Sequence, residues 1–201
     1  MPTSRYSLWM SSTSERLIES TRELLWERGY VGTSPKAIQE RSGVGQGSMY
    51  HHFGGKPDLA LAAITRSAEE RLATAEALFG APGTVTERIA GYLRVERDVL
   101  KGCPIGGLTQ DPDVMGDPAL RRPVETTFST LRTRITGLLA EGKESGEFGA
   151  ELDPVTTAST IVAVLQGGYV LARAADSVEP FAEAVDGVLG LLTAHTQTAP
   201  R

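Results

Sequence analysis

The sequence predicts an all-α protein, and three observations lead to this prediction. Apolar residues recur at the three- and four-residue spacing of amphipathic helices along most of the chain, and no segment alternates apolar and polar residues as a half-buried strand does. Glycine and proline stand where these periodic segments begin and end. With 201 residues, 40% of them hydrophobic, the chain can bury a core in one large domain or two small ones.

Three helices are expected near the N-terminus. The first carries one apolar stripe, has capping-box spacing between Ser12 and Glu15 at its start, and is followed by Gly29 at its C-cap. In the second, Ser34 is the expected N-cap and Pro35 the first helical residue, where a missing N–H costs nothing. The expected ranges are 14–28, 34–42 and 46–52, and residues 1–13 are expected to form a flexible arm.

Longer helices are expected in the rest of the chain, at 56–79, 85–100, 119–144, 153–176 and 180–195, with a turn-rich segment at 102–118 that has room for one short helix. The helix after Asp153 is apolar or small almost all round, so it must be buried on several sides. The last helix also carries an apolar stripe. We therefore expect these two C-terminal helices to form the surface shared by a homodimer; a core hairpin within a monomer is the alternative.

Charge is divided unevenly along the chain, whose formal net charge is −5. Residues 1–56 carry seven Lys/Arg and five Glu, a net of +2, whereas residues 57–201 carry thirteen basic and twenty acidic side chains, a net of −7. Only charges within about 10 Å of the phosphates act strongly on DNA at ordinary salt concentrations. An acidic body therefore does not exclude a nucleic-acid partner for the basic end.

The sequence also indicates the cellular compartment in which the protein is expected. No apolar run approaches the ~20 residues needed to cross a bilayer, and the start of the chain lacks the pattern of a secretory signal. The single cysteine, Cys103, excludes an internal disulfide and fits a reducing environment. These features predict a cytoplasmic protein without a membrane partner. Met10 is an alternative to Met1 as the start.

The second and third helices are joined by Ser-Gly-Val-Gly, with Gly43 where a left-handed turn is needed. Together with the first helix they form the arrangement of a helix-turn-helix, whose last helix is free to enter a major groove. Met49 and Phe53 are four residues apart and share the face toward the core. The other faces carry hydrogen-bonding groups suited to base edges and phosphate oxygens: Gln46, Ser48, Tyr50, His51 and His52.

A longer pattern strengthens this interpretation. It is the run Gly29-Tyr30-x-x-Thr33-Ser34-x-x-x-Ile38-x-x-x-Ser42-Gly43-Val44-x-x-Gly47-Ser48-x-Tyr50-x-His52-Phe53-x-x-Lys56-x-x-Leu59. This run resembles the DNA-binding head of the tetracycline-repressor (TetR) family, and the likeness covers residues 14–64. The remainder resembles the family in helical architecture and length.

The resemblance implies a homodimer with about nine helices per subunit. A three-helix, helix-turn-helix head at 14–56 would bind a double-stranded DNA operator, and a helical domain at 57–201 would bind a ligand and dimerise. The implied function is that of a ligand-responsive transcriptional regulator, a repressor that binds a palindromic operator and is released by a small-molecule inducer of unknown identity.

The resemblance also assigns DNA contacts by position. Gln46 would read a base edge, and Gly47 would let the backbone approach the DNA. His52 would pack or brace the turn. His51 would contact the backbone or a thymine methyl group, and phosphates would be contacted by Thr33, Ser48, Tyr50 and Lys56. Ser34 and Lys36 are also expected among the DNA-binding residues, although Lys36 can equally be interpreted as a solvated surface charge.

An inducer site is expected among the helices of the C-terminal domain and the 102–118 segment. Its candidate lining residues are large or polar side chains on otherwise apolar faces, and each can also be interpreted as an ordinary core residue: Tyr92, Cys103, Met115, Phe128, Gln166 and Tyr169. No cofactor and no metal are predicted. His51 and His52 are adjacent on a helix, so their side chains point about 100° apart, and no third ligand stands near them in the sequence.

Two alternatives stay open. The segment Lys101-Gly102-Cys103-Pro104-Ile105-Gly106 resembles a Gly-Cys-x-x-Gly element whose cysteine senses oxidants or electrophiles in some branches of the family, so a redox-sensing repressor is one alternative. A helical protein-interaction module without DNA binding is the other, although the polar side chains of the third helix suit an apolar docking face poorly. An enzyme is not expected, because no nucleophile and base have a signature spacing.

Overall fold

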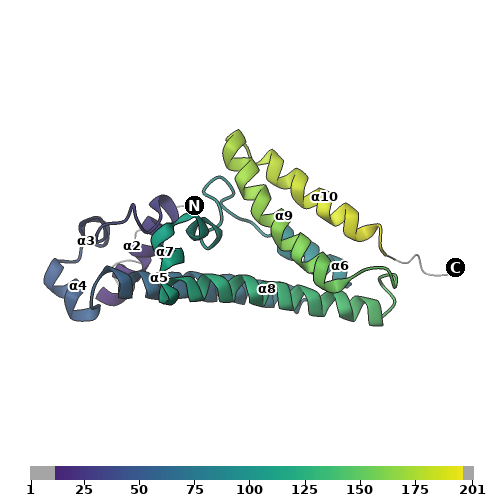
Figure 1. Cartoon of the computed structure of the whole chain (residues 1–201), viewed down its shortest axis with the longest axis horizontal. Helices are drawn as coiled ribbons and strands as arrows, with labels where there is room; N and C mark the ends of the chain where they lie inside the picture. Colours follow the sequence, from purple (N-terminus) through teal and green to yellow (C-terminus); the bar gives the residue numbers. More distant parts are fainter. Residues whose placement is uncertain (1–11, 197–201) are drawn as a thin grey trace. The chain divides into compact units, whose positions relative to one another are not determined.

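The computed structural model describes residues 12–196, and helices make up almost all of their regular secondary structure (Figure 1). They form nine α-helices, α2 to α10, and one short 3-10 helix, η1; within this range the β-structure is limited to an isolated bridge between Phe148 and Thr196. The all-α prediction is confirmed. Residues 1–11 of the expected arm, Met10 among them, lie outside the described residues.

Two compact units make up the chain. One contains the residues up to Glu69 together with Pro104–Val124, and the other contains Glu70–Cys103 together with the residues from Glu125 onward. Two long helices, α5 (Lys56–Phe79) and α8 (Pro118–Glu144), contribute residues to both units.

Three helices of the first unit pack around one core. These helices are α2 (Thr13–Arg28), α3 (Pro35–Ser42) and α4 (Gln46–His52), and they follow the predicted ranges closely. The predicted caps are present, because Ser12 Oγ accepts the N–H of Glu15 and Ser34 Oγ accepts the N–H of Ala37. The Glu15 carboxylate is bound by the Arg66 guanidinium on α5, at 3.0 and 3.1 Å. The core residues are Leu17, Leu24, Ile38, Val44, Met49 and Leu59.

The turn-rich segment predicted at 102–118 contains η1 (Gly106–Gln110) and α7 (Pro112–Gly116), both in the first unit. Asp111 lies between them and is buried. Its Oδ1 accepts the N–H groups of Asp113 and Val114 at the start of α7. Its Oδ2 accepts those of Tyr30 and Val31, at 2.7 and 2.9 Å, in the loop after α2. A single carboxylate therefore fastens α7 to the helix-turn-helix.

The second unit is built on α6 (Val85–Arg94), α9 (Pro154–Ala175) and α10 (Glu179–Thr193). α9 and α10 lie side by side, and α10 also contacts α6 (Figure 1). The approach of α9 to α10 is close at Gly168, where an added Cβ would lie 3.1 Å from Cδ2 of Phe181. Of the two adjacent glycines in α9, Gly168 thus serves helix packing, whereas an added Cβ at Gly167 would meet nothing within 4 Å.

The predicted helix at 85–100 was too long, because α6 ends at Arg94. Arg97 explains the early end. Its guanidinium donates to the carbonyl oxygens of Tyr92, Leu93 and Val95, with Nη1 at 2.6 Å from the oxygen of Leu93. Carbonyl groups in a last helical turn have no intrahelical partners, and here a side chain three residues beyond the helix supplies their donors.

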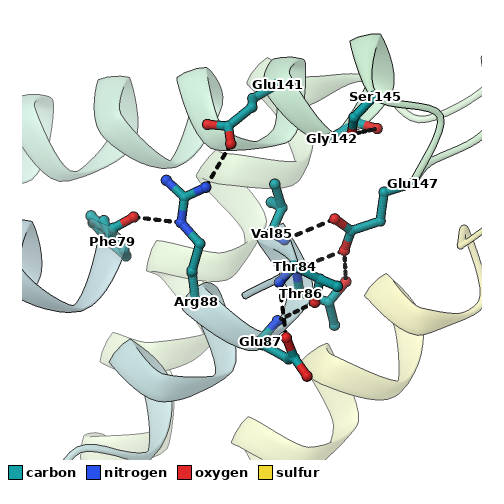
Figure 2. A network of polar contacts seen from close by, with 10 residues as sticks. All are labelled: Phe79, Thr84, Val85, Thr86, Glu87, Arg88, Glu141, Gly142, Ser145 and Glu147. Atoms are coloured by element: carbon teal, nitrogen blue, oxygen red, sulfur yellow. Dashed lines mark hydrogen bonds and ion pairs between the residues drawn. The ribbon is translucent and has the colours of Figure 1, made fainter. Parts of the chain in front are cut away.

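The start of α6 is held just as firmly (Figure 2). Thr84 and Glu87 form a capping box. The Glu147 carboxylate accepts the N–H groups of Val85 and Thr86, each at 2.8 Å, and the Thr86 hydroxyl at 2.6 Å. Arg88 donates to the carbonyl oxygen of Phe79 and to the Glu141 carboxylate. Polar contacts at both ends therefore fix the position of α6.

By length and composition alone, α9 is long and apolar enough to cross a membrane. No segment of this kind was expected from the sequence. In the structure the buried face of α9 packs against α10, and Tyr169 of α9 contacts the ring of Phe181 of α10 at 4.8 Å between ring centroids. One face of α9 is thus packed inside the second unit, but the predicted burial on several sides is not found within the described chain, because apolar residues such as Val170 and Leu171 are exposed.

Candidate functional site

The exposed surface of α4 carries the residues predicted to contact DNA. Met49 is completely buried and Phe53 half-buried, as their spacing predicts. The remaining side chains of the helix, with that of Tyr50 49% exposed, lie in solvent: Gln46, Ser48, Tyr50, His51 and His52. At Gly47 an added Cβ would meet nothing within 4 Å, so packing within the protein does not require glycine there.

The connection before α4 sets the direction of this helix. Gly43 has φ 65° and ψ 23°, a left-handed conformation that glycine adopts without a Cβ clash. Arg16 on α2 donates to the carbonyl oxygen of Ser42 at 2.5 Å, and Val44 lies in the core. After α4, the Asp58 carboxylate accepts the N–H of Gly54 at 3.0 Å. The helix is therefore fixed at both ends while its outer face stays uncovered by the rest of its unit.

The other predicted DNA contacts differ in their surroundings. Ser34 and Lys36 are exposed at the start of α3, where Lys36 lies 3.8 Å from Glu40. Thr33 is buried, and its hydroxyl donates to the carbonyl oxygen of Gly29 at 2.7 Å. The Lys56 ammonium lies over the Tyr30 ring, 3.9 Å from the ring centroid. Ser34 and Lys36 thus share the exposure of the α4 residues, whereas Thr33 does not.

In the second unit, three of the six predicted ligand-contacting residues come together. Tyr92, Cys103 and Tyr169 are buried, and they interact electrostatically with the guanidinium groups of Arg71 and Arg97. We call these five residues the arginine–tyrosine cluster. Phe128 on α8 and Gln166 on α9 are half-buried, and neither forms a hydrogen bond or ion pair with the cluster within the described residues. Met115 belongs to α7 in the first unit.

Burial sets the direction of the pKa shifts of Tyr92, Tyr169 and Arg97. It raises the pKa of the Tyr92 and Tyr169 hydroxyl groups, and the two nearby guanidinium charges only partly offset this effect. Burial also lowers the pKa of Arg97, and the charge of Arg71 lowers it further. At neutral pH the cluster therefore combines two positive charges with neutral phenols.

Sequence reasoning missed three residues that organise these sites: Arg71, Arg97 and Asp111. Each works through partners that the chain brings together from a distance or across an irregular turn, so no local spacing marks them. Arg71 does follow the carboxylates of Glu69 and Glu70 on a helix, where an arginine reads as an ordinary surface charge. No group of three or more His, Cys, Asp or Glu side chains suited to a metal occurs within residues 12–196.

Two family models match the chain. The model for bacterial regulatory proteins of the tetR family matches residues 17–63, and the model for the tetracyclin repressor-like C-terminal domain matches residues 84–188. The chain belongs to the tetR family. It is a helix-turn-helix transcriptional regulator, and the regulators of this family bind DNA operators, act as dimers and are not enzymes. Family membership does not favour the redox-sensing and protein-interaction alternatives.

Relatives of this TetR-family regulator cover most of its length. The HTH-type transcriptional repressor DhaR of Mycobacterium sp. is 23% identical over 91% of the chain and 93% of its own length. The HTH-type transcriptional regulator YezE of Bacillus subtilis is 30% identical over 64% of the chain and 69% of its own. A TetR transcriptional regulator from Chloroflexus aurantiacus has a similar crystal structure, with a TM-score of 0.84, 28% identity, and coverage of 93% of this chain and 97% of that one.

Proposed function

We propose that this regulator is a repressor whose dimer binds a palindromic operator through α4 and is released by a small-molecule inducer. One observation carries the proposal: α4 exposes only hydrogen-bonding side chains around Gly47, while its apolar residues are buried in the head. Glycine lowers helix stability by about 1 kcal/mol relative to alanine, and nothing inside the protein requires it at this position. A partner that must approach the helix backbone gives a reason for its presence.

Within this proposal the DNA contacts have distinct roles. Gln46 reads a base edge in the major groove, and Gly47 allows the backbone to come close. Phosphates are contacted by Ser34 and Lys36 at the start of α3 and by three residues of α4 and α5: Ser48, Tyr50 and Lys56. His51 contacts the DNA backbone or a thymine methyl group. For Thr33 we propose a bracing role, because its hydroxyl already donates to Gly29.

The second subunit is proposed to bind along α9 and α10. These helices expose large apolar side chains that a monomer would leave in water: Val155, Val170, Leu171, Val178 and Leu191, of which Val170 and Leu191 are 67% and 66% exposed. Exposed apolar surface on two adjacent helices is typical of an interface between subunits. A palindromic operator, with one half-site for each head, matches the two-fold symmetry of such a dimer.

Operator binding tests the proposal. An operator is selected from random duplex DNA, and its affinity is measured by fluorescence anisotropy over a range of salt concentrations. We expect the logarithm of the affinity to fall with the logarithm of salt by about 0.9 for each phosphate neutralised. Tyr50→Phe should weaken binding to all sequences alike, whereas Gln46→Ala should relax the preference at one base pair by ~1–3 kcal/mol.

The matched control is Gln110→Ala, which removes the same side chain from an exposed position of η1 and should leave binding unchanged. Equal effects of Gln46→Ala and Tyr50→Phe on every sequence would show that the roles are assigned wrongly. Absence of any salt-sensitive affinity for duplex DNA would refute the function itself.

A further inference from the structure

Two arginines of the second unit form no ion pair with a carboxylate in the described part of the chain. Arg88, Arg94 and Arg134 in this unit each form an ion pair with a carboxylate. Arg71 on α5 and Arg97 after α6 form none with any residue between 12 and 196, although both are largely screened from solvent and close enough to repel each other. Charges removed from water without an opposite charge are rare in proteins, because desolvation disfavours them.

One nitrogen atom of the Arg97 guanidinium, Nε, donates no hydrogen bond within the described residues. The two Nη atoms of Arg97 donate to carbonyl oxygens at the end of α6, and its guanidinium lies over the Tyr92 ring with Cζ 5.2 Å from the ring centroid. These contacts hold the group in one orientation. Its Nε–H, in contrast, is buried and has no hydrogen-bond partner within the described part of the chain.

The cluster contains a second buried polar group without a hydrogen-bond partner among the described residues. Tyr169 is only 3% exposed, and its hydroxyl is buried without a hydrogen-bond partner among the described residues. The Arg71 guanidinium lies near enough to this hydroxyl to lower its pKa by its charge and by a weak donor interaction, but the two groups do not meet the geometry of a full hydrogen bond. Buried polar groups are almost always satisfied, so two unsatisfied ones in a single cluster indicate that an acceptor from outside the chain binds there.

The chemistry of the cluster specifies that acceptor. It offers the Nε–H of Arg97, the hydroxyl of Tyr169 and the guanidinium of Arg71, which are all donors, and a net positive charge. Planar oxyanions match such a donor set, and a guanidinium can bind a carboxylate through two parallel hydrogen bonds. The rings of Phe79 and Phe181 pack on Tyr92 and Tyr169, each pair with centroids 4.8 Å apart, so the surroundings are aromatic.

We propose that the arginine–tyrosine cluster binds the carboxylate group of a small organic acid, whose apolar part lies against the aromatic rings. The carboxylate supplies the missing acceptor and offsets one of the two guanidinium charges. A carboxylate fits these surroundings better than a phosphate ester, because a phosphate carries more charge and more hydration to remove. This inference rests on the proposed function only where the acid is taken as the inducer; binding itself can be measured without DNA.

The test uses the full-length protein and two probes, sodium benzoate and sodium propionate. Thermal unfolding is followed at increasing probe concentration, with sodium chloride at matched ionic strength and benzamide as the uncharged analogue of benzoate. We expect the carboxylates to raise Tm in a saturable manner and benzamide to leave it unchanged. If neither carboxylate raises Tm beyond sodium chloride, the proposal is wrong. A larger effect of inorganic phosphate than of both carboxylates would also overturn it.

Variants connect binding to the cluster. Arg71→Gln removes one charge, and the apparent affinity for benzoate should fall at least tenfold. Tyr169→Phe removes only a hydroxyl that has no hydrogen-bond partner among residues 12–196, so it should weaken benzoate binding while leaving the Tm of the free protein unchanged. Arg132→Gln, an identical change at an exposed position of α8, is the control and should behave as wild type. Unaltered binding by both cluster variants would place the carboxylate elsewhere and refute the proposal.

Operator affinity, measured in the same samples, separates this inference from the proposed function. If benzoate abolishes operator binding by the wild type and not by Arg71→Gln, both the carboxylate site and the proposed repressor function are supported. If the protein binds the operator but binds neither carboxylate, the carboxylate site is refuted and the proposed repressor function is not affected.

Discussion

The Asp111 carboxylate accepts four backbone N–H groups, two at the start of α7 and two in the loop after α2, about 80 positions away in the sequence. Backbone N–H groups in buried surroundings need such partners, because an unsatisfied one costs about 1–3 kcal/mol. At the scale of the residue, Asp111 therefore links the turn that leads into the helix-turn-helix to a segment far along the chain.

Replacement of Asp111 by alanine should lower the free energy of unfolding by roughly 2–4 kcal/mol, since the N–H groups of Tyr30 and Val31 lose their acceptor along with the cap of α7. Asp111→Asn keeps one carbonyl oxygen and should cost less. Urea denaturation measures both values. Asp113→Ala, at an exposed neighbour, is the control. A loss for Asp111→Ala no greater than that for the control would contradict the role given to this carboxylate.

Residues that act on their own neighbours could be recognised from the sequence. Ser12, Ser34 and Gly43 were predicted correctly, because a helix cap or a left-handed turn is formed within a few positions. Arg97 and Asp111 could not be found in this way. Each satisfies backbone groups outside the periodic pattern, and only the folded chain reveals which groups those are.

At the scale of the element, a helix end could be predicted where residues close to it in the sequence form it, and could not where a residue outside the periodic pattern forms it. α9 begins after Asp153 as predicted, because Asp153 accepts the N–H groups of Val155 and Thr156 within its own turn. The predicted C-terminus of α6 was wrong, because Arg97 replaces helical hydrogen bonds that the apolar spacing would have continued.

The start of α6 gives a test at this scale. Glu147→Ala removes the acceptor of the Val85 and Thr86 N–H groups and a negative charge at a helix N-terminus, so Tm should fall by several degrees, equivalent to about 1–3 kcal/mol. Glu147→Gln should cost less, since an amide oxygen can still accept. Circular dichroism on heating measures the change. Equal Tm values for Glu147→Ala and for Glu144→Ala, an exposed position near the end of α8, would count against this anchoring.

At the scale of the whole molecule, the exposed apolar side chains of α9 and α10 predict how the chain associates. Leu191→Glu combined with Val170→Glu should convert the dimer to a monomer, because two buried charges would face the partner without compensation. Analytical ultracentrifugation gives the mass. The affinity for a palindromic operator should also fall, because each monomer then binds a single half-site with its one head.

The control for this change is Leu100→Glu, at an exposed apolar residue of the second unit outside α9 and α10. A double variant that keeps the mass of a dimer would show that subunits meet on another surface. The uneven charge distribution fits such an assembly, because two heads, each slightly basic, bind DNA together more tightly than one can alone.

The double use of Arg97 restricts how relatives of this regulator can diverge. Its guanidinium closes the end of α6 with two nitrogen atoms, and its third, Nε, is buried without a hydrogen-bond partner among the described residues. A lineage that acquires an uncharged inducer cannot simply discard this arginine, because α6 would lose its terminus in the same mutation. The proposed recognition of a negative charge is in this way tied to the architecture of this chain, and a change of ligand class would require that another residue close α6 first.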